Sequence, residues 1–147
     1  MDLKNIGLGA ALAVAYSSVV ENPTEKQIRQ MVLKWDWLVN NTTPEKIADY
    51  YHPEAILLPT FDPNILKGRK AFIKYFTNLS SKPNFRVQLH HPMDIQRGYK
   101  MGIASGLYTF SSDEGSFLSR FTFVFKASKI GGYRVFTHHS SVLPTAP

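Results

Sequence analysis

The chain has 147 residues, 44% of them hydrophobic and 19% charged, which fits one globular domain with a sizeable core and argues against a disordered chain. It has no cysteine, which excludes a disulfide framework, a thiolate metal site and a cysteine nucleophile. Its formal charge is +6, but the basic residues are scattered along the chain, so we expect no nucleic-acid-binding patch.

Residues 1–21 are predicted to form an N-terminal extension. Lys4 precedes a short apolar run over residues 6–15, which ends in Ala13-Val14-Ala15. A positive start, a brief apolar core and an A-x-A end are the three parts of a secretory signal peptide, and the run is too short to span a membrane. Two interpretations stay open. A cleaved signal would predict a periplasmic or secreted protein, and a helix packed on the domain or on a partner subunit would predict a cytoplasmic one.

Residues 22–147 are predicted to form a single domain that begins with three helices. The first helix starts at residues 22–25, where Asn22 is a good N-cap, a proline follows and a glutamate completes a variant of the capping box. Its apolar residues recur at helical spacing and predict one buried stripe: Ile28, Met31, Val32, Trp35, Leu38 and Val39. A second, short helix is predicted over residues 43–51 and a third over residues 68–79.

The remaining segments are predicted to be strands. They cover residues 55–60, 85–90, 99–110, 119–125 and 133–141, with turns at Gly98, residues 111–115 and Gly131-Gly132. Because no helix links the later strands, we expect antiparallel pairing and an α+β fold. The three N-terminal helices should cover one face of a strongly curved, cone-shaped antiparallel sheet and leave a concave cavity between them. Gly102 and Gly106 are the predicted bend points.

The last two strands carry polar residues whose alternation divides them between the two faces of the sheet. Arg120, Thr122 and Val124 share one face, and Phe121, Phe123 and Phe125 share the other. On the final strand, His139 and Ser141 share one face, and His138 and Ser140 share the opposite one. A polar cluster among apolar neighbours on a curved sheet predicts a small-molecule pocket. Alternation alone leaves open which histidine faces the cavity.

Five segments together resemble a known family. They are His-Pro-Glu-Ala-Ile-Leu-Leu-Pro (52–59), Lys-Gly-Arg-Lys-Ala-Phe-Ile-Lys-Tyr-Phe (67–76), Ala-Ser-Gly-Leu-Tyr-Thr-Phe (104–110), Ser-Arg-Phe-Thr-Phe-Val-Phe (119–125) and His-His-Ser-Ser-Val-Leu-Pro (138–144). The chain resembles the SnoaL-like branch of the nuclear-transport-factor-2-like superfamily from about Glu25 to Pro144. Within that branch it looks similar to bacterial proteins akin to the association domain of calcium/calmodulin-dependent protein kinase II.

This resemblance implies a cone-shaped α+β barrel, a homodimer or larger ring, and a pocket between the sheet and the helices. It implies no single reaction, because members include isomerases, dehydratases, polyketide cyclases and assembly hubs. Enzymes such as the steroid isomerases place an acidic base in the cavity, but the matching residues 55–59 are apolar here. Hub-type relatives hold carboxylates with cavity arginines, and Arg120 lies in the strand where such an arginine is expected.

The candidate ligand-binding residues combine one cation with imidazoles and hydroxyls; they are Arg120, His139, Tyr108, Tyr75, Tyr51, Thr122, Ser141 and His138. Arg120 is either an anion-binding residue of the cavity or an exposed strand residue, because burying an unpaired guanidinium is costly. The histidines are either hydrogen-bonded core residues or acid–base groups. Because His138 and His139 point to opposite faces, we expect no metal site, and no cofactor is predicted.

Two classes of function stay open. The first is a non-catalytic domain that binds a small carboxylate or another anion, or that assembles into oligomers. The second is a small isomerase, cyclase or dehydratase acting on an apolar carbonyl compound, in which a histidine or tyrosine moves a proton and Arg120 holds charge. No catalytic residue is assigned. We expect a homodimer formed through the outer face of the sheet, with Phe121, Phe123 and Phe125 in the interface, and no membrane span.

Overall fold

The computed structural model describes residues 22–146. The predictions about residues 1–21, including the signal peptide, lie outside the described residues. Within residues 22–146 there are three helices and seven strands, in the order α2 (Glu25–Asn41), α3 (Pro44–Asp49), β1 (Tyr51–Leu58), β2 (Leu66–Lys67), α4 (Arg69–Ser80), β3 (Arg86–Leu89), β4 (Asp94–Gly98), β5 (Met101–Ser112), β6 (Gly115–Ala127) and β7 (Tyr133–Val142).

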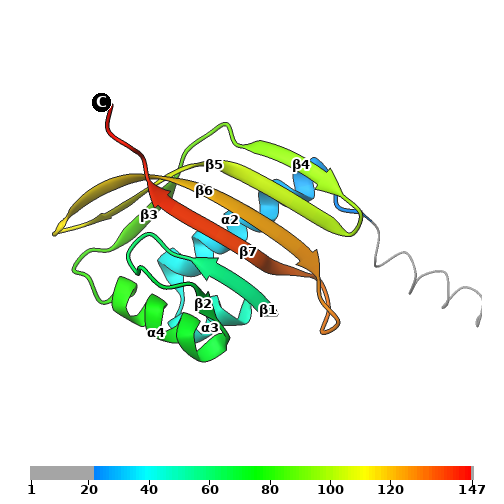
Figure 1. The fold of residues 1–147 in the computed structure, drawn as a ribbon, viewed down its shortest axis with the longest axis horizontal. Coiled ribbons are helices and arrows are strands. Elements are labelled where there is room, and N and C mark those ends of the chain that lie inside the picture. The colour runs from blue at the N-terminus through cyan, green and yellow to red at the C-terminus, as the bar shows by residue number, and fades with distance from the viewer. Residues whose placement is uncertain (1–21, 147) are drawn as a thin grey trace, which may run out of the picture.

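The strands form one curved sheet in the order β2-β1-β7-β6-β5-β3, and β4 also pairs with β5 (Figure 1). The long strands β5, β6 and β7 pair antiparallel, as predicted. However, β1 and β7 pair in parallel, so the expectation of purely antiparallel pairing is wrong. The sheet ends at β2 on one side and at β3 and β4 on the other. It is therefore open rather than closed into a barrel.

The helices cover one face of this sheet, which confirms the predicted α+β architecture. Figure 1 shows α2 running behind the sheet, with α3 and α4 at the end that holds β1 and β2. The predicted stripe of α2 faces the sheet, and Ile28, Val32 and Trp35 are each at most 1% exposed. Within residues 22–146, no helix lies on the other face of the sheet. Among the described residues, no helix is long and apolar enough to cross a membrane.

Helix α2 begins two residues later than predicted. Its N-cap is Thr24, whose side chain accepts a hydrogen bond from the Gln27 backbone N–H while the Gln27 side chain accepts one from the Thr24 N–H. This is a reciprocal capping box. The predicted cap, Asn22, instead accepts a hydrogen bond from the backbone N–H of Lys100 at 2.7 Å, so it joins the helix entrance to the β4–β5 turn.

Two strand boundaries also differ from the prediction. Strand β1 begins at Tyr51, which the sequence assigned to the preceding helix, and it includes Pro53. The pairing of β1 with β7 is irregular between Tyr51 and Ile56, so the missing N–H of this proline interrupts no regular ladder. Strand β4 was not predicted, because Gly98 was interpreted only as a turn before the next strand.

Close contact between α2 and the sheet explains one of the predicted bend glycines. A Cβ atom at Gly102 of β5 would lie 2.6 Å from Cγ1 and 2.8 Å from Cδ1 of Ile28. Such distances are too short for carbon atoms, so only glycine lets α2 pack this closely on β5.

Candidate functional site

The space between the sheet and the helices, where the sequence predicts a pocket, is almost filled. The remaining cavity measures about 10 Å³, and its walls include Trp35, Tyr75, Tyr108, His138 and Ser140. This volume admits about one water molecule. We call this space the inner chamber. These aromatic side chains were predicted to line a ligand pocket, but they pack against one another and fill the space.

His138 lies at the centre of the inner chamber. It is 2% exposed and stacks on Phe123, with 4.0 Å between the ring centroids. Its Nδ1 lies 2.9 Å from the hydroxyl of Tyr51, and its Nε2 lies 3.0 Å from the hydroxyl of Tyr108. The indole N–H of Trp35 donates to the Tyr51 hydroxyl at 3.0 Å. Both imidazole nitrogens therefore have hydroxyl partners.

These contacts favour one tautomer of His138 over the other. Tyr51 accepts a hydrogen bond from Trp35, a pure donor, so its own O–H is free to donate to Nδ1 of His138. Nε2 then carries the proton and donates to Tyr108. Tyr108 in turn bonds to Ser140, whose hydroxyl contacts that of Thr60. In this arrangement every buried polar group in the chain of contacts has a partner.

Burial makes the inner chamber a poor acid–base site. Desolvation and, to a smaller extent, the nearby His139 together lower the pKa of His138 to about 3. Burial also raises the pKa of the hydroxyls of Tyr51 and Tyr108 well above their ordinary value. At neutral pH the imidazole and both phenols are therefore uncharged. They hold the core in one arrangement, which is the hydrogen-bonded structural role that the sequence left open for His138.

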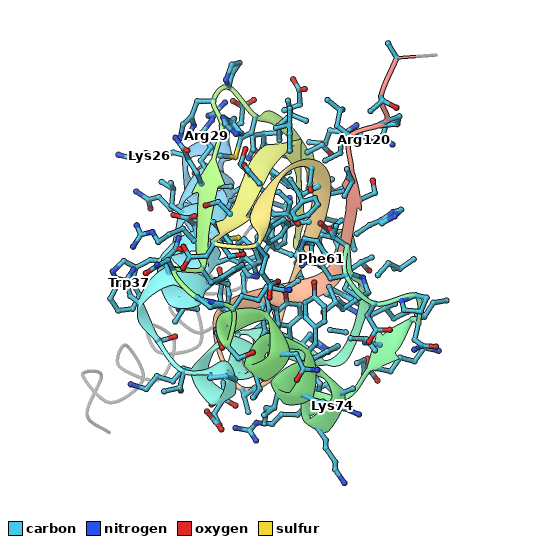
Figure 2. The ribbon with its side chains drawn as sticks, turned by 90° about the vertical axis from the view of Figure 1, so that its left-hand side faces the viewer. Lys26, Arg29, Trp37, Phe61, Lys74 and Arg120 are labelled. Carbon is cyan, nitrogen blue, oxygen red and sulfur yellow. The ribbon has the colours of Figure 1, made fainter. Side chains whose placement is uncertain are left out.

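The remaining candidates lie on the opposite, uncovered face of the sheet. Arg120 and His139 are exposed, and Thr122 and Ser141 are half-buried on the same face. Figure 2 shows Arg120 on the side of the molecule opposite to Arg29 and Trp37 of α2. The prediction that Arg120 faces the helix-covered cavity is therefore wrong. The predicted alternation is correct, but the two faces were exchanged.

The phenylalanines explain this exchange. Phe121, Phe123 and Phe125 are at most 3% exposed and belong to the hydrophobic core, because three aromatic side chains gain more from burial than an arginine and a threonine do. They are therefore not available for an interface, and the argument that they cover a dimer contact is wrong. The face of the sheet that is relevant to the oligomeric state is the opposite, uncovered one.

The uncovered face has a groove of about 640 Å³, which we call the outer groove. Its floor is formed by β5, β6 and β7, and one wall is the segment from His90 to Asp94. In the strand pairing Arg120 lies opposite Ser141, and Thr122 lies opposite His139. Directly opposed residues on one face are close enough to act on one ligand. Four of the predicted residues are thus brought together, but outside the inner chamber.

Arg120 is available for a ligand in this groove. No carboxylate of residues 22–146 lies within ion-pair distance of its guanidinium, since the ion pairs there join Arg29 to Glu25, Arg69 to Asp49 and Lys82 to Glu114. The wall of the groove was not predicted, because the sequence assigned His90 only to the end of a strand. The strand signal before His90 was visible in the sequence, but nothing in the sequence showed that this turn lies beside β6 and β7.

No family model and no curated protein matches this chain. Solved structures do match. A protein from Xanthomonas campestris, described as a candidate calcium/calmodulin-dependent protein kinase II association domain, aligns with a TM-score of 0.75 and 22% identity over 84% of this chain and 91% of its own. Nuclear transport factor 2 from Cryptosporidium parvum aligns with a TM-score of 0.66 and 22% identity over 84% of this chain and 98% of its own.

A candidate dehydratase of the same fold from Streptomyces avermitilis aligns with a TM-score of 0.69 and 12% identity, over 82% of this chain and 96% of its own. The names of these three proteins cover an association domain, a transport factor and an enzyme, so the similarity carries the fold and no single function. The alignments agree with the helix-covered, curved open sheet described above. The chain has the nuclear-transport-factor-2-like fold.

Proposed function

We propose that this chain is a non-catalytic domain that binds a small carboxylate in the outer groove and assembles with a second copy. The observation that carries this proposal is the contrast between the two candidate sites. The inner chamber has room for about one water molecule, whereas the outer groove measures about 640 Å³ and contains an arginine without an acidic partner among the described residues.

The chemistry of the outer groove suits a carboxylate. A guanidinium binds a carboxylate through two parallel N–H bonds, a geometry that a lysine cannot reproduce. The Ser141 hydroxyl lies across the strand pair from Arg120 and can donate a further hydrogen bond. Thr122 already interacts with Ser105 at 3.3 Å, so its hydroxyl is held in place beside the guanidinium. These groups are donors for an anion.

One residue of the groove opposes such a ligand. Asp94 lies in the wall, and its carboxylate repels an anion that approaches Arg120. The groove should therefore discriminate between ligands by their charge and shape. A small monocarboxylate can place its one negative charge against Arg120, whereas a bulky polyanion also brings negative charge close to Asp94.

The inner chamber argues against the enzymatic alternative. An apolar carbonyl substrate does not fit into about 10 Å³, and the neutral, doubly hydrogen-bonded His138 has no free nitrogen to exchange a proton with a substrate. Catalysis there would require Trp35, Tyr75 and Tyr108 to leave their packed positions. Such a change would open the core of the domain.

Calorimetric titration with acetate tests the ligand proposal. The wild type should bind, and Arg120→Ala should weaken binding about tenfold or more, because a hydrogen bond to a charged group is worth about 1.5–3 kcal/mol. Arg120→Lys should restore only part of the affinity. Lys74→Ala is the control: it also removes one positive charge, but at the far end of the molecule from Arg120 (Figure 2). Equal affinities in all four proteins would refute the proposed role of Arg120.

A further inference from the structure

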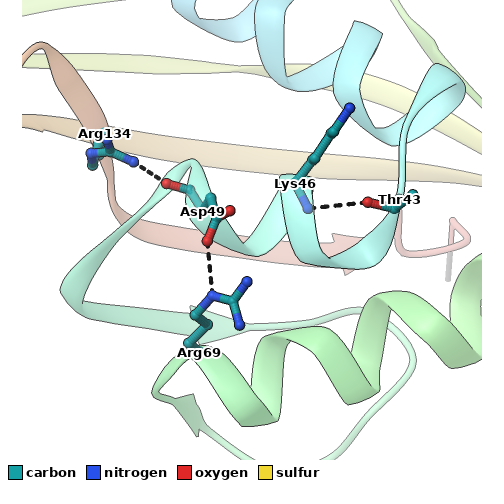
Figure 3. A network of polar contacts seen from close by, with 5 residues as sticks. All are labelled: Thr43, Lys46, Asp49, Arg69 and Arg134. Atoms are coloured by element: carbon teal, nitrogen blue, oxygen red, sulfur yellow. Dashed lines mark hydrogen bonds and ion pairs between the residues drawn. The ribbon is translucent and has the colours of Figure 1, made fainter.

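A third cavity lies where α3 ends and where α4 and β7 begin. It measures about 460 Å³, and the residues that define its chemistry are Asp49, His52, Arg69, Phe72, Ile130 and Arg134. Figure 3 shows that Arg134 and Arg69 approach the same residue, Asp49, from two different elements. We call this cavity the arginine cavity. Among the residues that line it, none lines the outer groove, so the two are separate.

Arg134 is incompletely satisfied. Its Nη1 donates to the backbone carbonyl of Asp49, but its Nε is enclosed and has no hydrogen-bond partner in the part of the chain that the structure describes. In that same part, no carboxylate lies within ion-pair distance of its guanidinium. Native proteins rarely leave a shielded N–H without an acceptor, so such a group calls for a further partner.

Arg69 supplies a second guanidinium. Its Nε donates to Oδ1 of Asp49 at 2.8 Å, and this hydrogen bond and the charge of Asp49 raise the pKa of Arg69. Within residues 22–146, no hydrogen bond involves its two terminal nitrogens, so they can bind a ligand. One aspartate thus lies between two arginines, and the lining of the arginine cavity keeps a net positive charge.

The start of α4 adds to this positive charge. The helix has 12 residues, its N-cap is Gly68 without a side-chain capping bond, and its first turn contains no acidic residue. Instead Arg69 and Lys70 occupy the first turn. Positive side chains at the positive end of a helix dipole are unfavourable unless an anion compensates them.

His52 offers a donor from another wall of the cavity. Its Nδ1 accepts a hydrogen bond from the Glu54 backbone N–H at 3.1 Å, so in the neutral ring the proton is on Nε2. The ring stacks on Phe136 with 5.2 Å between centroids and 13° between planes, which fixes its orientation. Nε2–H is therefore an oriented donor.

We propose that the arginine cavity binds a phosphate group. Its free groups are donors that come from different elements: the guanidiniums of Arg134 on β7 and Arg69 on α4, and the imidazole of His52 on β1. A tetrahedral oxyanion with several acceptor oxygens can meet donors from several directions, whereas a planar carboxylate presents only two oxygens. An anion that draws the Arg134 guanidinium slightly into the cavity gives its Nε an acceptor.

Titration with inorganic phosphate at constant ionic strength tests this site. The wild type should bind with a dissociation constant of about 1 mM or tighter. Arg134→Gln and Arg69→Gln should each weaken binding about tenfold or more, and Arg134→Lys should restore part of the affinity. Lys74→Ala, which removes an exposed positive charge outside the lining of this cavity, is the matched control and should leave phosphate binding unchanged, whereas Arg120→Ala tests whether phosphate occupies the outer groove instead. Because the Arg69 side chain is exposed, Arg69→Gln remains informative if Arg134→Gln fails to fold.

The outcomes separate this proposal from the proposed function. Loss of phosphate binding in Arg120→Ala alone would place the anion in the outer groove and overturn the present inference. Absence of phosphate binding to the wild type would overturn it as well, whether or not acetate binds. O-phosphoserine, titrated in parallel, distinguishes the sources: equal affinity indicates a free phosphate ion, and tighter binding indicates a phosphate ester, either of which requires the same dependence on Arg134 and Arg69.

Discussion

His138 and His139 are neighbours in the chain that lie in opposite environments. His138 is 2% exposed and bonded to two tyrosines, whereas His139 is exposed in the outer groove. Alternation along the strand predicted that they would face apart, but it could not decide which one faces the helices. The phenylalanines of β6 decide it. His138 pairs with Phe123 across β6 and β7, so it follows Phe123 into the core.

The stability of the domain should depend on pH through His138. Its folded-state pKa of about 3 lies below its ordinary value of 6.5, so between these values the unfolded chain binds more protons than the folded one. The contribution of His138 to stability is complete above pH 6.5 and declines as the pH falls. At pH 4.5 the loss should be about 2–3 kcal/mol, from about 1.4 kcal/mol per pKa unit.

Chemical denaturation of the wild type and of His138→Gln between pH 7 and 4.5 measures this effect. The glutamine keeps one donor and one acceptor but does not titrate, so the variant should be less stable at pH 7 and should lose less stability on acidification. His139→Gln is the control on the opposite face and should follow the wild-type curve closely, apart from the small effect of losing the charge that helps to lower the pKa of His138. Parallel curves for the wild type and His138→Gln would contradict the account of His138.

The contact between α2 and β5 is the element-scale feature that sets the depth of the inner chamber. Helix α2 was predicted from its apolar stripe, and the residues of that stripe are buried except for Met31, which is half-buried. The start of α2 and the existence of β4 were not predicted, because both depend on contacts between distant segments. Asn22 bonds to Lys100 instead of capping the helix, and β4 exists only as a partner of β5.

Gly102→Ala should destabilise the domain by about 1–3 kcal/mol, because the new methyl group would overlap Ile28 in the packed core. Thermal or denaturant unfolding measures this loss. Gly98→Ala is the control, since its Cβ would come no closer than 3.7 Å to Met101, an ordinary contact. The double variant Ile28→Ala/Gly102→Ala should lose less stability than the sum of the losses of the two single variants. Equal stability of Gly102→Ala and Gly98→Ala would show that the contact between α2 and β5 is unimportant.

At the scale of the whole molecule, the family resemblance predicted the fold, and the pattern of apolar and turn residues predicted that it consists of helices and a curved sheet. Neither of them predicted that the sheet is open or that β1 pairs in parallel with β7. Residues 51–58 and 133–142 lie far apart in the sequence, and no local signal shows that they are neighbours. The exchange of the two faces had a different cause: Arg120 was placed by analogy, whereas burial of the phenylalanines decides the orientation.

The uncovered face of the sheet should mediate the proposed homodimer. Ile103, Val124 and Thr137 lie side by side on this face, across β5, β6 and β7. Sedimentation should show a dimer at micromolar concentration. Val124→Asp should weaken the affinity of the two copies for each other at least about tenfold, because in a twofold-symmetric dimer both copies place the substituted residue in the interface. Leu33→Asp, on the outward side of α2, is the control and should leave the dimer intact. A monomeric wild type would remove this proposal.

The central claim is that small carboxylates bind in the outer groove and not in the inner chamber. Protein NMR during an acetate titration tests this claim in one measurement, because the Arg120 Nε–H and the Trp35 indole N–H report on the two sites. We predict that the resonances of Arg120 and His139 shift with acetate concentration, while those of Trp35 and Tyr108 stay in place. Saturable shifts at Trp35 and Tyr108 with Arg120 unchanged would contradict the account and place the ligand inside the chamber.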